Sequence, residues 1–107
     1  MIYLTAQSSI LLASAPVDFR RGIDGLAAVC QHSLGHNPRT GTLFVFINRA
    51  HTMVRILAYE NNGYWLMTKR LSKGRYQGWP KTQDPLSPYQ AHQLRQLLSN
   101  LLHSGDD

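Results

Sequence analysis

The sequence has a single cysteine, Cys30, among its 107 residues. An internal disulfide is therefore excluded, and a reducing compartment is favoured, which we expect to be the cytoplasm. No apolar run approaches the ~20 residues of a membrane-spanning helix. The short apolar run 10–15 has no Lys or Arg before it, as a secretory signal would require. We expect a protein without a membrane association.

Acidic residues are also scarce, with six Asp and Glu against eleven Lys and Arg. They fall at a predicted helix start, in a hairpin, in a loop and at the C-terminal end: Asp18, Asp24, Glu60, Asp84, Asp106 and Asp107. Metal-dependent phosphoryl transfer needs two or three clustered carboxylates, and nothing in this distribution brings them together. No P-loop, dinucleotide fingerprint or G-x-S-x-G motif occurs either. We therefore predict no enzyme activity, metal site, cofactor or small-molecule substrate.

The N-terminal third predicts a strand and then a helix. Residues 8–14 form a short apolar segment that ends before Pro16, and Asp18 is a plausible helix N-cap. Cys30 lies on the apolar stripe of that helix, so we expect an inert, buried thiol. Gly35 is well placed as the left-handed residue after the last turn.

The middle of the chain predicts a strand followed by a hairpin. Residues 43–47 are continuously apolar, which is typical of a strand covered on both faces. Residues 54–60 and 64–69 flank a turn signal at 61–63, and residues 75–79 could add a further strand. If all of 61–63 forms the loop, one face presents Arg55, Tyr59, Trp65 and Lys69, and the core face carries Val54, Ile56, Ala58 and Leu66. A two-residue turn would break this sorting, so the sorting favours the longer loop.

The last element is predicted to be a helix. Ser87 is read as its N-cap, Pro88 as its first residue and Gln90 as a capping-box residue. An apolar stripe follows (Leu94, Leu97, Leu98, Leu101 and Leu102), and Gly105 ends it. The predicted fold is a single α+β domain over residues 1–107. It has a mostly antiparallel sheet of four to five strands with two packed helices, in the order strand, helix, strands, helix.

Positive charge is concentrated in the middle of the chain. Residues 25–83 hold eight basic residues and one acidic residue, Glu60, which gives this segment a net charge of +7. Aromatic residues alternate with these cations, most densely in residues 64–80. Cations neutralise phosphates and flat rings stack on bases, so the pattern favours a nucleic-acid partner. The alternatives are a basic surface that only keeps the protein soluble, and aromatic rings that belong to the core.

At these positions the chain resembles the TnpB-type accessory protein of the insertion sequence 66 family of bacterial transposons. The resemblance covers roughly residues 9–102. It rests on ordered blocks at residues 16–27, 41–46, 48–49, 55–57, 63–66, 69–71, 74–76 and 79–80. The family usually has Met at position 19, Lys at position 21 or 55, and Trp-Asp at positions 59–60. This chain has Phe19, Arg21, Arg55 and Tyr59-Glu60 there.

The resemblance implies a non-catalytic accessory role in DNA transposition, beside a separate and larger transposase. We expect contact with DNA, either duplex or transposon ends, with the transposase, or with both. The residues expected to make this contact are Arg20, Arg21, Arg49, Arg55, Tyr59, Trp65, Lys69, Arg70, Lys73 and Arg75. The alternative is a protein–protein interaction module that docks the transposase without touching DNA. A cryptic enzyme is a third and weaker interpretation.

Overall fold

The computed structural model describes residues 4–102. These residues form two α-helices, one π-helical turn and seven strands, in the order β1 (Ile10–Ala13), α1 (Ile23–Ala28), the π-helical turn η1 (Val29–Ser33), β2 (Leu43–Ile47), β3 (Met53–Glu60), β4 (Gly63–Arg70), β5 (Arg75–Tyr76), β6 (Leu86–Tyr89), α2 (Ala91–Ser99) and β7 (Leu101–Leu102). The predicted α+β class is confirmed.

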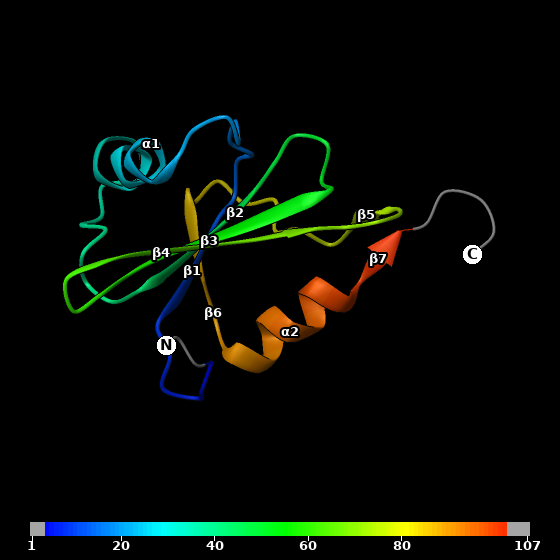
Figure 1. The fold of residues 1–107 in the computed structure, drawn as a ribbon. Coiled ribbons are helices and arrows are strands. Elements are labelled where there is room, and N and C mark those ends of the chain that lie inside the picture. The colour runs from blue at the N-terminus through cyan, green and yellow to red at the C-terminus, as the bar shows by residue number, and fades with distance from the viewer. Residues whose placement is uncertain (1–3, 103–107) are drawn as a thin grey trace.

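A five-stranded sheet is the centre of the fold, with the strand order β4-β3-β2-β1-β6. β1 pairs parallel with β2, and all other neighbours in this sheet are antiparallel. Strands β5 and β7 form a separate two-stranded sheet. Helices α1 and α2 lie on opposite faces of the main sheet (Figure 1).

The core consists of two apolar layers, one on each face of the sheet. α1, η1 and one face of β2 and β3 form a layer that includes Leu26, Cys30 and Phe44, which are fully buried. α2 and the other face form a second layer that includes Leu94 and the Trp79 ring. All five residues of β2 are buried, as predicted for a strand covered on both sides.

The first helix starts later than predicted, and Asp18 is not its N-cap. The Asp18 carboxylate accepts the backbone N–H and the guanidinium of Arg20, which folds residues 18–20 into a local turn. The helix begins at Ile23 with Gly22 in the N-cap position. The predicted stop is confirmed, since Gly35 has a φ of 68°.

The hairpin has a two-residue turn, so the predicted three-residue loop is wrong. Glu60 pairs directly with Gly63, Tyr59 with Tyr64 and Ala58 with Trp65. The turn is Asn61-Asn62, and Asn61 adopts a φ of 58°, which Asn tolerates better than most residues. This one-residue change in register moves every side chain of β4 to the opposite face from the predicted one.

The predicted second helix also begins later, because residues 86–89 form a strand. β6 pairs with β1 through Leu86, Ser87, Pro88 and Tyr89. Pro88 is tolerated because β6 is an edge strand. Gln90 is the N-cap of α2 and exchanges capping-box hydrogen bonds with Gln93. The helix ends at Ser99, and the predicted stop at Gly105 lies outside the described residues.

The predicted strand at 75–79 is reduced to two residues in the small sheet. Trp79, at its far end, is buried and donates its indole N–H to the Ala13 carbonyl at 2.9 Å. Tyr76 is buried as well. Both rings therefore belong to the core rather than to a binding surface.

Candidate nucleic-acid or partner interface

The connection between β2 and β3 is a rigid turn that presents Arg49 at its tip. The Asn48 side chain accepts the backbone N–H groups of Thr52 and Met53 at 2.9 and 3.1 Å, and donates to the Thr52 hydroxyl at 3.0 Å. The His51 backbone N–H donates to the Asn48 carbonyl. These bonds fix the turn, so the exposed Arg49 extends from a stiff base.

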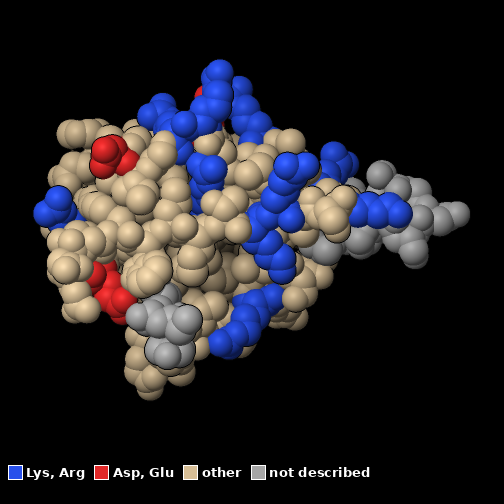
Figure 2. Space-filling model, in the orientation of Figure 1, with Lys and Arg blue, Asp and Glu red and all other residues tan. Residues whose placement is uncertain are grey.

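The chain after β4 runs alongside this turn. The backbone N–H of Leu71 donates to the Thr52 carbonyl at 2.9 Å, and that of Tyr76 donates to the His51 carbonyl at 2.8 Å. The exposed side chains of Arg70, Lys73 and Arg75 are therefore brought to the end of the sheet that carries Arg49. Figure 2 shows Lys and Arg gathered over the top and right of the molecule, while the acidic atoms in view lie mostly to the left.

A groove of about 630 Å³ opens between the β2–β3 turn and residues 75–81. We call it the basic groove. It is lined by Arg49, Ala50, His51, Arg75, Tyr76, Gln77, Gly78, Trp79 and Lys81. Three of these side chains are basic, Arg49, Arg75 and Lys81, and none is acidic. The groove can therefore hold an anion without first displacing a carboxylate.

A second groove of about 620 Å³ lies on the other side of Arg49 and includes Asp18, Phe19 and Arg20. Here the charge is compensated, because Arg20 forms an ion pair with Asp18 at 2.7 Å. The side-chain hydrogen bond from Arg20 lowers the pKa of the Asp18 carboxyl to about 2. This second groove is therefore less suited to a polyanion than the basic groove.

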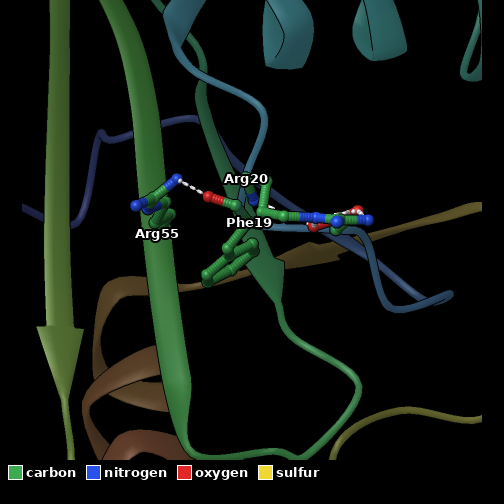
Figure 3. Close-up of polar contacts among 4 residues, drawn as sticks. Phe19, Arg20 and Arg55 are labelled. Carbon is green, nitrogen blue, oxygen red and sulfur yellow. Dashed lines mark hydrogen bonds and ion pairs between the residues drawn. The ribbon is translucent and has the colours of Figure 1, made fainter.

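Arg55 is turned toward its own protein. Its Nη1 donates to the carbonyls of Phe19 and Arg21 at 2.6 and 3.0 Å, and its Nε donates to the Thr68 hydroxyl at 3.0 Å. Its guanidinium lies 4.9 Å from the centre of the Phe19 ring. In Figure 3 Arg55 reaches from β3 to the Phe19 carbonyl, whereas Arg20 points away from it. Arg55 thus anchors the segment before α1.

The predicted face of Arg55, Tyr59, Trp65 and Lys69 does not exist. In the observed register Arg55 and Tyr59 lie on the face of α1, and Trp65 and Lys69 lie on the face of α2. Tyr59 packs edge-to-face on Tyr64, with the two ring centres 5.0 Å apart. The Arg39 guanidinium lies 5.2 Å from the centre of the Tyr59 ring. The predicted core residue Leu66 likewise shares the α1 face rather than that of Val54.

The other predicted contact residues are distributed as follows. Arg49 and Arg75 line the basic groove, and Arg70 and Lys73 belong to the exposed segment that leads from β4 to the residues of its lining. Lys69 is exposed near the end of β4, and Arg21 is exposed before α1. Sequence reasoning missed Lys81 and His51 as groove residues. Lys81 directly follows Trp79-Pro80 at the end of the same basic stretch, and this position in the sequence could have indicated that it belongs to the site.

Metal-ligating, thiol and membrane-spanning groups are the remaining features of the described residues. Residues 4–102 contain no group of three or more His, Cys, Asp or Glu placed to hold a metal ion. Burial raises the pKa of the Cys30 thiol to about 11, which fits the predicted inert cysteine. No helix in this part of the chain is both long and apolar enough to cross a membrane.

Comparison with known proteins identifies the family. The family described as IS66 Orf2 like protein matches residues 8–104. Two similar proteins of Sinorhizobium fredii are the uncharacterized proteins y4hO and y4jC. The first is 34% identical to this chain, over 86% of this chain and 79% of its own length. The second is 37% identical, over 63% of this chain and 57% of its own length. No solved structure matches. The chain belongs to the IS66 Orf2-like family of transposition accessory proteins.

Proposed function

We propose that this protein assists transposition by binding duplex DNA through the basic groove, without catalysing a reaction itself. The observation that carries the proposal is the composition of the groove, which has Arg49, Arg75 and Lys81 in its lining and no acidic side chain. Cations in such an arrangement neutralise successive phosphates and release counterions. Arg70 and Lys73, in the segment that leads to the groove, extend the positive surface, and the cytoplasm is the compartment in which the protein meets DNA.

Duplex is favoured over single-stranded DNA because the Tyr and Trp rings in the groove lining are buried. Stacking on unpaired bases needs an accessible aromatic face. Tyr76 and Trp79 are only 1% and 5% exposed, and the Trp79 indole is held by the Ala13 carbonyl. Phosphate contact, which does not depend on sequence, should therefore dominate binding.

The test is fluorescence anisotropy with a labelled duplex of transposon-end sequence across a salt series. If about five cations reach phosphates, the slope of the logarithm of the binding constant against the logarithm of salt concentration is about −4.5. Arg49→Gln, Arg75→Gln and Lys81→Gln should each reduce the slope by about 1. Arg39→Gln is the matched control, since Arg39 is exposed but lies against Tyr59, outside the basic groove. Binding that is absent, or equally weakened by the control, would refute the proposal.

Docking of an acidic surface of the transposase is the second candidate. The same groove favours it, because Arg is common at protein interfaces and Arg49 and Arg75 both line the groove together with Lys81. A pull-down of the transposase that survives nuclease treatment and is lost in Arg49→Gln would support this candidate. A pull-down that nuclease abolishes would assign the contact to DNA instead.

A further inference from the structure

The two edges of the main sheet are protected to very different degrees. β6 is a four-residue edge strand that contains Pro88, and both its shortness and the proline limit pairing with a further strand. β4 is an eight-residue edge strand without proline. Within residues 4–102 no strand pairs with its outer side. A long edge of this kind is a template for another strand.

The register shows which backbone groups point outward from β4. The Leu71 N–H donates to the Thr52 carbonyl, and in an antiparallel ladder such hydrogen-bonded pairs occur at every second residue. Trp65, Met67 and Lys69 therefore direct their N–H and C=O groups toward β3. The amides of Tyr64, Leu66 and Thr68 point away from the sheet and are available to another strand.

The side chains of β4 add an apolar pair on the α2 face. Trp65 is 47% exposed and Met67 is 38% exposed, and they are the large hydrophobic side chains left exposed in the described part of the chain. They lie two residues apart on the same strand, so they point to the same side. The Trp65 indole N–H donates to the Glu60 carboxylate at 2.9 Å, which holds the ring in place.

We propose that β4 pairs antiparallel with β4 of a second copy of this chain, with the two-fold axis passing through Leu66. This register uses the outward amides, because Leu66 then pairs with its own equivalent and Tyr64 pairs with Thr68 of the second copy. It also places Trp65 of each copy directly opposite Met67 of the other copy. The Met67 thioether then covers the exposed Trp65 ring. The two five-stranded sheets become one continuous sheet.

Charge complementarity supports a second copy as the occupant. In this register Lys69 of one copy lies opposite Gly63 of the other, and Gly63 is the cross-strand neighbour of Glu60. Nothing lies within 4 Å of where a Gly63 Cβ would be. The Lys69 side chain can therefore extend over the glycine toward the Glu60 carboxylate on the same face. The contact occurs twice because the axis repeats it.

Hydrogen exchange and sedimentation test the proposal on the full chain. The amides of Tyr64, Leu66 and Thr68 should become protected as protein concentration rises, in parallel with a shift from monomer to dimer by analytical ultracentrifugation. A chain that stays monomeric with these amides exchanging rapidly would overturn the proposal. Protection of the same amides only on addition of the transposase would overturn it too, and would make the partner's strand the occupant.

A charge swap tests the register. Lys69→Glu and Glu60→Lys should each weaken dimerisation several-fold, up to about tenfold, since each places like charges together at two symmetric contacts. The double variant should restore most of the loss. Lys81→Glu is the matched control, because it makes the same charge change away from β4. Circular dichroism checks that each variant folds. A dimer unaffected by Lys69→Glu and by Met67→Lys uses another surface, and the proposal fails.

Discussion

Replacing Arg55 by Met should loosen the segment before α1 and lower the stability of the whole domain. Met keeps the apolar stem but removes three hydrogen bonds, to the Phe19 and Arg21 carbonyls and to the Thr68 hydroxyl. A hydrogen bond to a charged group contributes about 1.5–3 kcal/mol, and less where the group is partly exposed, as Arg55 is. The contact with the Phe19 ring adds about 0.5–1 kcal/mol.

The expected loss for Arg55→Met is about 2–4 kcal/mol in the free energy of unfolding. With a urea m-value of about 1.5 kcal/mol/M, a 3 kcal/mol loss lowers the unfolding midpoint by about 2 M. Arg55→Lys keeps the positive charge but loses the planar guanidinium group and its several N–H donors. We therefore expect a smaller loss of about 1–2 kcal/mol in the free energy of unfolding. Equilibrium urea unfolding followed by circular dichroism measures both.

Two further measurements separate this anchoring role from DNA contact. Arg75→Met is the matched control, since Arg75 is exposed and should change stability by less than about 0.5 kcal/mol. Arg55→Lys should leave the salt slope of DNA binding unchanged, whereas Arg49→Gln should reduce it. The anchoring argument fails if Arg55→Met is as stable as the unaltered chain, or if Arg55→Lys changes the slope as much as Arg49→Gln.

Three other predictions concern single side chains. The Tyr76 hydroxyl is buried without a hydrogen-bond partner in the described structure, so Tyr76→Phe should be neutral or stabilising by up to about 1 kcal/mol in urea unfolding. A clear loss of stability would contradict this. Burial raises the pKa of the Cys30 thiol to about 11, so a disulfide reagent at pH 8 should modify Cys30 only after unfolding; rapid modification of the native protein would refute it. The pKa of Asp18 is lowered to about 2 by Arg20, so the ion pair stabilises the fold above the ordinary value near 3.8 and is lost as pH falls toward 2. In Arg20→Gln an NMR titration should show this pKa moving part of the way back toward its ordinary range, because the backbone N–H of residue 20 still donates to the carboxylate. A pKa that the substitution leaves unchanged would exclude the Arg20 side chain as the main cause.

The elements that could be predicted are those whose signal is local. β2 follows from five consecutive apolar residues, and the left-handed Gly35 follows from a glycine after an apolar stripe. β6 could not be predicted, because Ser87-Pro88 is locally a good helix start. Its pairing partner Leu11 lies more than seventy residues away. Strand pairing at that distance outweighs the local preference.

The candidate site was predicted in composition but not in geometry. A basic surface around Arg49 and Arg75 follows from the charge of the middle segment. The hairpin turn could not be decided, because Asn61-Asn62 and Asn61-Asn62-Gly63 both satisfy turn chemistry. A difference of one residue moved Trp65 to the opposite face. Nor does the sequence show that the charge of Arg55 is directed at backbone carbonyls.

The position of β1 has a consequence for how the protein is made. Of the five strands of the main sheet β1 is synthesised first, yet it lies inside the sheet between β2 and β6, and Ile10 pairs with Tyr89. Until residue 89 has left the ribosome, one side of β1 has no neighbour to pair with. Synthesis at roughly 5–20 residues per second leaves that edge open for several seconds. A product that terminates before β6 would keep it open, so a shortened copy of the gene should yield an aggregating chain rather than a weaker accessory protein.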